Sequence, residues 1–336
     1  METQIRPDLS IAIGNTPMAK IYFTYKGQQR ILYAKMESFN LTGSIKDRIA
    51  MHIIDESYRK GLLKPGDEIV EATSGNTGVS FAAVGAAYRH NITIYMPDWM
   101  SEERKQLIKS FGTNIRLVSK EEGGFLGSIE MTKTHKANNP NVFLPCQFDN
   151  DYNTETHYQT TGPEIKNQMS QLGIQPDAFV AGVGTGGTVM GTGNYLKEKY
   201  PAVKVHPLEP ANSPTLSTGY KVGKHRIQGI SDEFIPSIVK LDELDSIIEV
   251  DDGDSIIMAQ LLARRLGIAV GISSGANFLG AIKAQEMLSP EANVVTIFSD
   301  SNKKYLSTDL AREESVKDDF LSTHVDLLGF ELIACN

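Results

Sequence analysis

The chain is organised around the stretch Asn40-Leu41-Thr42-Gly43-Ser44-Ile45-Lys46-Asp47-Arg48. The alternating apolar run at residues 31–37 predicts a strand before it, and the spacing of residues 49–59 predicts a helix after it. A loop of small residues therefore delivers Lys46 to a helix N-terminus, whose partial positive charge lowers the pKa of a lysine. Such a lysine suits Schiff-base chemistry. The alternative is a surface helix on which Lys46 and its two neighbours are solvated.

The bulk composition narrows the class of protein. The 336 residues carry a formal net charge of -8 without a basic block, which argues against nucleic acid and membrane surfaces as partners. Cys146 and Cys335 lie far apart without metal-ligand spacing, which favours a reduced, cytoplasmic setting over a disulfide framework. The seven histidines are scattered, so we predict no metal site. No signal-peptide core or membrane-spanning run is present in the sequence.

Predicted strands and helices alternate along most of the chain. Apolar runs at residues 68–72, 91–97, 178–181 and 294–298 predict strands, with helical patterns between them. This alternation predicts an α/β protein with parallel sheets covered on both faces. The length corresponds to roughly two domains at about 150 residues each, and we place a crossing between them at the polar residues 149–153.

Two loops rich in small and hydroxyl residues each follow a predicted strand and open a predicted helix. Residues 182–188 contain four glycines and two threonines, which suits a phosphate because the backbone can approach it closely at a helix N-terminus. Residues 73–78 present hydroxyl and amide donors that are better suited to a carboxylate. The sequence therefore predicts two anion sites.

The first of these loops also matches a dinucleotide fingerprint. Gly182, Gly184 and Gly187 satisfy GxGxxG, and Glu209 follows about twenty residues later, as an NAD-type oxidoreductase requires. That interpretation leaves Lys46 and the other anion loop without a use. A phosphorylated cofactor that bonds covalently to lysine uses all three features.

Five motifs together resemble those of the pyridoxal-phosphate enzymes related to cysteine synthase and cystathionine β-synthase. In chain order they are residues 40–48, 73–78, 184–188, 271–275 and 305–308. The resemblance covers residues 8 to 310. It departs at Leu41, where the family usually has proline.

The resemblance implies a fold of two open parallel-sheet domains, that of the tryptophan synthase β-like (fold type II) enzymes. Residues 1–40 and 151–312 would form a large domain that binds the cofactor phosphate, and residues 41–150 a small substrate-binding domain. Residues 313–336 would form a C-terminal tail. The resemblance also implies a homodimer.

The resemblance assigns roles residue by residue. Lys46 would form the internal aldimine with pyridoxal 5'-phosphate, Asn76 would contact the ring 3-hydroxyl, and Ser273 would meet the pyridine nitrogen. The remaining residues would hold the phosphate (Gly184, Thr185, Gly186, Gly187 and Thr188) or the substrate carboxylate (Thr73, Ser74, Thr77 and Gln147).

The hydroxyl of Ser273 indicates the type of reaction. A neutral hydroxyl cannot keep the pyridine nitrogen protonated as a carboxylate would, so the ring is a weaker electron sink. This favours β-elimination over racemisation and transamination. Lys46 would remove the Cα proton, the β-substituent would leave to give α-aminoacrylate, and a nucleophile would add to the β-carbon.

Residues 228–236 depart from the family in an informative way. Cysteine synthases usually have small, uncharged residues at the positions of Ser231, Asp232 and Glu233, and cystathionine β-synthases have a tyrosine at the position of Asp232. A carboxylate there repels incoming sulfide, but it can act as a general base on water. We therefore expect Asp232 to activate water, so that L-cysteine and water give L-serine and hydrogen sulfide.

Two alternatives remain open from the sequence. In the first, Asp232 and Glu233 pair with Lys221, Lys224 or Arg226, and the protein is a cysteine synthase that makes L-cysteine and acetate from O-acetylserine and sulfide. In the second, it is a catalytically silent relative that binds a partner through its cleft. The intact Lys46 and the complete phosphate loop argue against a silent relative.

Overall fold

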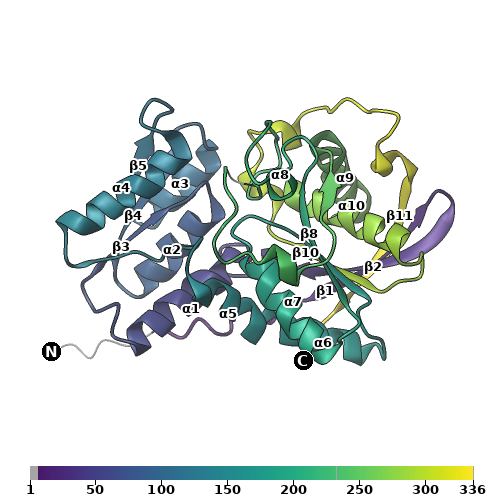
Figure 1. Ribbon diagram of the computed structural model, residues 1–336, viewed down its shortest axis with the longest axis horizontal. Coiled ribbons are helices and arrows are strands. Elements are labelled where there is room, and N and C mark those ends of the chain that lie inside the picture. The colour runs from purple at the N-terminus through teal and green to yellow at the C-terminus, as the bar shows by residue number, and fades with distance from the viewer. Residues whose placement is uncertain (1–6, 232, 336) are drawn as a thin grey trace.

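Two sheets covered by helices divide the chain into a smaller and a larger unit (Figure 1). The computed structural model describes residues 7–231 and 233–335. The smaller sheet has the strand order β5-β4-β3-β6, and the larger has the order β11-β1-β2-β10-β7-β8-β9. The chain begins in the larger sheet, builds the smaller one, and then returns to the larger.

The smaller sheet is entirely parallel. Its strands are β3 (Glu68–Ala72), β4 (Asn91–Pro97), β5 (Asn114–Val118) and β6 (Val142–Phe143). Its helices are α1 (Lys46–Arg59), α2 (Asn76–Ala87), α3 (Glu102–Ser110) and α4 (Gly124–Asn138). A core of aliphatic and aromatic side chains, among them Ile53, Ile69 and Phe81, lies between the sheet and α1, α2 and α3. Crossover helices cover both faces of a parallel sheet, so its strands are buried in apolar surroundings.

The larger sheet is parallel from β2 to β9 and ends in two antiparallel strands, β1 and β11. Its strands are β1 (Met18–Tyr25), β2 (Gln28–Met36), β7 (Ala178–Gly182), β8 (Lys204–Pro210), β9 (Ile248–Val250), β10 (Val294–Phe298) and β11 (Val325–Ile333). Its helices are α5 (Asp151–Gln159), α6 (Thr161–Gln171), α7 (Gly187–Lys199), α8 (Thr215–Thr218), α9 (Asp252–Leu266) and α10 (Ile272–Met287). Separate apolar clusters pack on its two faces.

The α/β fold class with two sheets is confirmed, and two local expectations need correction. The pattern at residues 155–172 predicts one helix, but the chain breaks at Thr160 into α5 and α6. Within the predicted tail, residues 325–333 form β11, which pairs with β1 along its length. Successive side chains of a strand point to opposite faces of the sheet. Val325 and Leu327 of this strand therefore pack against the core, whereas the residues next to them are exposed.

A buried ion-pair network joins α1 to the larger unit. Arg48 is 1% exposed and bonds to Glu37 at 2.7 Å and to Glu164 at 2.6 Å. Lys35, fully buried, bonds to Glu164 at 2.7 Å. Burial alone would raise the pKa of Glu37, but the neighbouring Arg48 guanidinium outweighs burial and lowers it to about 2. The alternative of a solvated surface helix at residues 46–48 is therefore wrong.

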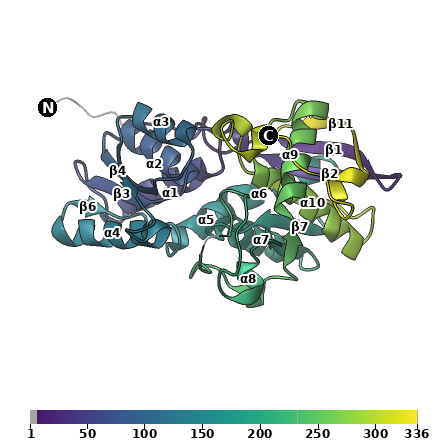
Figure 2. The ribbon, with the colours of Figure 1, turned by 90° about the horizontal axis from the view of Figure 1, so that it is seen from above.

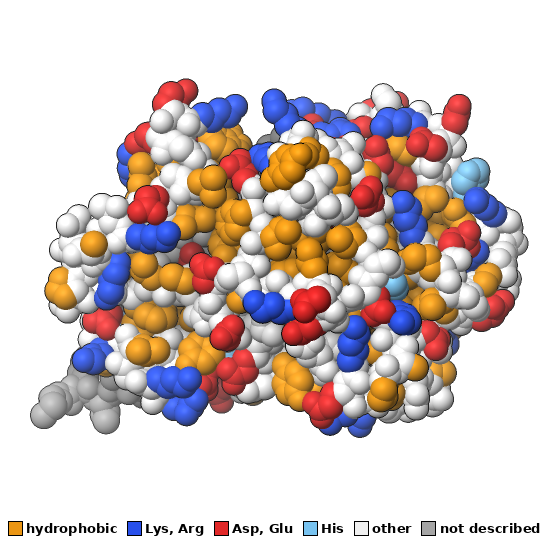
Figure 3. Space-filling view, in the orientation of Figure 1, with side chains coloured by type: hydrophobic (Ala, Val, Ile, Leu, Met, Phe, Trp, Pro, Cys, Tyr) orange, Lys and Arg blue, Asp and Glu red, His pale blue; other side chains and the backbone are white. Residues whose placement is uncertain are grey.

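The two units lie side by side when the molecule is seen from above (Figure 2). Within residues 7–231 and 233–335, none of the helices combines the length and the apolar character needed to cross a membrane. On the face shown in Figure 3, acidic and basic side chains are interspersed over most of the surface. The negative net charge is thus not gathered into one large patch on that face.

Candidate active site

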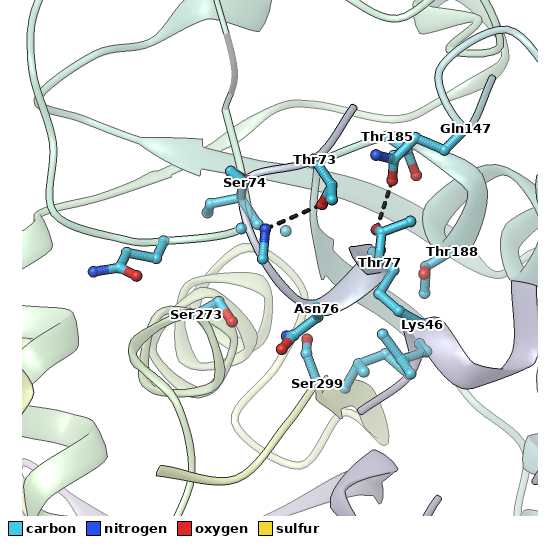
Figure 4. Close-up of a pocket in the computed structure, with 18 of the residues that line it drawn as sticks. Lys46, Thr73, Ser74, Asn76, Thr77, Gln147, Thr185, Thr188, Ser273 and Ser299 are labelled. Atoms are coloured by element: carbon cyan, nitrogen blue, oxygen red, sulfur yellow. Dashed lines mark hydrogen bonds between the residues drawn. The ribbon is translucent and has the colours of Figure 1, made fainter. Parts of the chain in front are cut away.

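One pocket between the two units collects almost all of the predicted site residues (Figure 4). It lies where β3, β7 and β10 end, which is where parallel sheets usually bind ligands. The loop after β3 and the start of α1 come from the smaller unit, and the loop after β7 comes from the larger. The predicted residues that line it are Lys46, Thr73, Ser74, Asn76, Thr77, Gln147, Gly184, Thr185, Gly186, Thr188 and Ser273.

Lys46 is the first residue of α1, and the residues around it are tied down. The buried carboxylate of Asp47 accepts hydrogen bonds from the backbone and hydroxyl of Thr42, at 2.6 and 2.5 Å, and from the Ser80 hydroxyl at 2.6 Å. The Ile45 amide donates to the carbonyl of Ser299 at 2.9 Å. Burial raises the pKa of Asp47, and these donors work against that rise. The loop therefore holds Lys46 in one place at the pocket wall.

The loop at residues 73–78 is braced internally and by a distant residue. The Gly75 amide donates to the Thr73 hydroxyl at 3.0 Å, and the Thr77 hydroxyl donates to Gln147 Oε1 at 2.6 Å, both drawn in Figure 4. Gln147 in turn donates through Nε2 to the Ala72 carbonyl at 3.0 Å. The loop leads into α2, whose N-terminal amides favour an anion.

The loop at residues 182–188 forms a cradle that only glycine can build. A β-carbon at Gly184 would lie 2.4 Å from the carbonyl oxygen of Gly229, and one at Gly186 would lie 2.2 Å from Val239. Gly186 also has a φ of 91° at the N-cap of α7. Gly187, which is absent from the pocket lining, packs against Asn153 instead. The backbone amides at the start of α7 and the hydroxyls of the loop are thus accessible to an anion.

Asn76 is oriented by a buried carboxylate. Its Nδ2 donates to Asp300 at 2.7 Å, and the Tyr305 hydroxyl donates to the same carboxylate oxygen. Burial raises the pKa of Tyr305, so its hydroxyl stays a donor. Within the described part of the chain, the buried Oδ1 of Asn76 has no hydrogen-bond partner. A buried polar atom of this kind at a pocket wall is suited to a bound ligand.

Arg104 is a pocket residue that the sequence analysis did not identify. It comes from α3, is 2% exposed, stacks on the Tyr305 ring at 4.6 Å and donates to the side chain of Gln228. Its position three and four residues before Leu107 and Ile108 places it on the inner face of α3, and this spacing could have pointed to it. It adds a buried positive charge to the pocket.

Asp232 lies outside the described residues, but its neighbours form the rim of a second hollow that adjoins the pocket. Ser231 and Glu233 line that hollow, which shares Ser74, Arg104 and Gln228 with the first. Glu233 pairs with Lys221 at 2.8 Å, as one alternative expected. Arg226, another of the three cations considered, pairs instead with Asp252 at 2.7 Å and Glu314 at 2.6 Å.

The dinucleotide interpretation needs the Glu209 carboxylate as a hydrogen-bond acceptor, but this carboxylate is already occupied. This carboxylate is fully buried and accepts hydrogen bonds from the backbone amides of Leu216 at 2.6 Å and Ser217 at 3.1 Å. It thus caps the first turn of α8. Among residues 7–231 and 233–335, no three histidine, cysteine or acidic side chains cluster in a way that could hold a metal ion.

Comparisons with known proteins show the family to which the chain is related. The family model described as "Pyridoxal-phosphate dependent enzyme" matches residues 9–300. A probable cysteine synthase from Bacillus subtilis (strain 168) is 44% identical over 298 residues, which cover 89% of this chain and 95% of that protein.

Among solved structures, the hydrogen sulfide-producing enzyme from Fusobacterium nucleatum is 59% identical, with a TM-score of 0.95 over 97% of this chain and 98% of that chain. A D232N mutant of that enzyme, in complex with an α-aminoacrylate intermediate, is 60% identical, with a TM-score of 0.94 over 95% and 96% of the two chains.

Proposed function

Because the chain belongs to the family of pyridoxal-phosphate-dependent enzymes that includes cysteine synthase, we propose that it converts L-cysteine and water to L-serine and hydrogen sulfide. The observation that carries this proposal is Asp232, a carboxylate in a segment where cysteine synthases usually have small, uncharged residues. Further support comes from the similarity to a hydrogen sulfide-producing enzyme. The D232N mutant of that enzyme was solved in complex with an α-aminoacrylate intermediate.

Pyridoxal phosphate fits the residues of the pocket. The glycine cradle, the α7 amides and the hydroxyls of Thr185 and Thr188 suit its phosphate, and the buried Oδ1 of Asn76 suits a ring substituent. Lys46 and Ser273 line the same pocket and would meet its aldehyde carbon and its ring nitrogen. When bound, the cofactor withdraws electrons from the substrate, so that the Cα proton and a β-substituent can leave.

The protein's own groups would then orient the substrate and move its protons. Thr73, Ser74, Thr77 and Gln147 would bind the carboxylate, because their donors and the α2 amides favour an anion. The Lys46 amine would take the Cα proton while the C–S bond breaks and the sulfur leaves the β-carbon as hydrosulfide anion. The same amine would return the proton to Cα at the end.

Asp232 would supply the step that distinguishes this reaction from cysteine synthesis. Its carboxylate would take a proton from water while the water oxygen bonds to the β-carbon, which yields L-serine. Release of that proton regenerates the carboxylate and balances the protonation of hydrosulfide to hydrogen sulfide. A negative charge at this position would also oppose the return of hydrosulfide anion. General-base catalysis of this kind contributes roughly 10²–10⁴-fold to a rate.

The test is Asp232→Asn assayed with L-cysteine in ¹⁸O-labelled water. We expect the formation of ¹⁸O-labelled serine, followed by mass spectrometry, to fall by about a hundredfold or more. Glu233→Gln is the matched control. Because Glu233 is paired with Lys221, this substitution should leave the rate of serine formation nearly unchanged. Serine formation at the wild-type rate in Asp232→Asn would overturn the role of Asp232.

Cysteine synthase remains the second candidate, favoured by the similarity to the probable enzyme of Bacillus subtilis. It predicts rapid formation of L-cysteine and acetate from O-acetylserine and sulfide, and slow breakdown of L-cysteine. A comparison of the two rates on one preparation separates the candidates.

The homodimer stays a prediction, which sedimentation of the purified protein would test.

A further inference from the structure

Helix α5 lies directly behind the glycine loop, and two of its side chains have no assigned role. Asn153 and His157 are four residues apart and therefore share one face of the helix. Both are fully buried. Each contacts one of the two loop threonines labelled in Figure 4, Thr185 and Thr188.

Asn153 determines the direction in which the Thr185 hydroxyl can donate. Its Nδ2 donates to Thr185 Oγ1 at 2.8 Å and to the carbonyl of Gln147 at 2.8 Å. A carbonyl accepts hydrogen bonds but cannot donate them, so Asn153 must present its amide nitrogen to both groups. Thr185 therefore accepts a hydrogen bond from Asn153 rather than donating one to it. Because a hydroxyl carries a single proton, Thr185 keeps its own proton for an acceptor elsewhere.

His157 stands in the same relation to Thr188. Its Nδ1 lies 2.9 Å from Thr161 Oγ1, and its Nε2 lies 3.2 Å from Thr188 Oγ1. Burial and the positive charges of Arg48 and Lys46 hold the pKa of His157 well below its usual value, so the ring is neutral. A neutral imidazole has one donor and one acceptor. If Nδ1 accepts from Thr161, Nε2–H donates to Thr188 and leaves the Thr188 proton for another acceptor.

We propose that Asn153 and His157 are positioning residues that turn the Thr185 and Thr188 hydroxyls toward the cofactor phosphate, with His157 in its Nε2–H form. The inference rests on the proposed placement of the phosphate at residues 184–188. A phosphate offers only acceptors to hydroxyl donors, and a charge-assisted hydrogen bond is stronger than a neutral one. The pair on α5 thus sets the direction of both hydroxyls before the phosphate arrives.

The test compares two matched amide variants of the holoenzyme. His157→Gln places a nitrogen donor near the position of Nε2, whereas His157→Asn is one methylene shorter and cannot reach Thr188. We expect the Asn variant, but not the Gln variant, to shift the ³¹P resonance of the bound cofactor. We also expect the Asn variant to raise the dissociation constant of the cofactor, measured by equilibrium dialysis, by about tenfold. This is the usual scale for the loss of a hydrogen bond to a charged group.

Thr188→Val completes a double-mutant cycle. If His157 acts through Thr188, His157→Asn combined with Thr188→Val should retain the cofactor as well as Thr188→Val alone. Additive losses, or equal losses in the Gln and Asn variants, would overturn the inference and indicate a packing role. If His157→Asn does not fold, Asn153→Ser with Thr185→Val runs the same cycle for the other pair.

The cycle also separates this inference from the placement of the phosphate. A ³¹P resonance unchanged by both Thr188→Val and Thr185→Val would contradict a phosphate at residues 184–188, and the inference would fail with it. A resonance shifted by the threonine variants but not by His157→Asn would contradict the inference alone.

Discussion

At Gly184 the backbone passes so close to Gly229 that a β-carbon would lie 2.4 Å from the Gly229 carbonyl oxygen. The neighbour is backbone, so it cannot move aside as a flexible side chain would. The residue type at this position is therefore set by a contact with a segment that follows 45 residues later in the chain. Sequence reasoning reached the same glycine from the phosphate loop motif.

Substitution of Gly184 by alanine should weaken cofactor binding. We expect Gly184→Ala to displace residues 229–230 or the loop, and to cost about 1–3 kcal/mol of cofactor binding, the range for overpacking a tight site. The visible absorbance retained by the purified protein after dialysis measures the loss. Gly329→Ala is the control, because a β-carbon there meets nothing within 4 Å. Equal retention in the two variants would contradict the cradle.

At the scale of elements, α1, β2 and α6 meet at the buried ion-pair network. Arg48 comes from α1, Lys35 from β2 and Glu164 from α6, and Glu37 follows directly after β2. Breaking such a buried pair costs about 3–5 kcal/mol because it leaves a charge uncompensated. The network thus holds the helix that begins with Lys46 against the larger sheet.

The network predicts a pH dependence of stability. Folding lowers the pKa of Glu37 from 4.5 to about 2, so its carboxylate contributes stability that is present above pH 4.5 and lost as the pH falls toward 2. At 1.36 kcal/mol per pKa unit, this contribution is about 3 kcal/mol at neutral pH. The difference between wild type and Glu37→Gln in free energy of unfolding should therefore shrink by about 2 kcal/mol between pH 7 and pH 3.

Urea unfolding at the two pH values measures this difference. Glu130→Gln is the control, because the Glu130 side chain is 71% exposed and its loss should change the free energy of unfolding by less than about 0.5 kcal/mol at either pH. A gap between wild type and Glu37→Gln that stays constant from pH 7 to pH 3 would mean that folding does not lower the pKa of Glu37.

At the scale of the whole molecule, the pocket draws its lining from both units. Lys46 and Asn76 begin helices of the smaller unit, whereas residues 184–188 and Ser273 belong to the larger. A ligand that contacts both sides links the units and binds only the folded chain. Such a ligand stabilises the fold by mass action.

Removal of pyridoxal phosphate should therefore lower the melting temperature. At a hundredfold excess over its dissociation constant, the cofactor adds about 2.7 kcal/mol, which corresponds to a shift of several degrees. Thermal unfolding of the apoprotein, with and without added cofactor, measures this shift. Pyridoxal without its phosphate is the control and should restore less stability. Full restoration by pyridoxal would contradict a phosphate site in the glycine loop.

The sequence by itself determined the alternation of strands and helices and the loops that carry Lys46, Asn76 and the phosphate cradle. These features are local: the period of apolar residues follows from backbone geometry, and a strand–loop–helix unit places its own loop at the end of its strand. The residue type at position 232 also came from the sequence, and with it the proposed reaction.

Only the tertiary structure decided which distant side chains complete the site. Arg104 stacks on Tyr305, and His157 lies behind Thr188. The division of residues 155–172 at Thr160 and the pairing of β11 with β1 also appeared only there. The physical reason is that such contacts depend on how separate elements cross and pack, and short-range periodicity carries no record of those crossings.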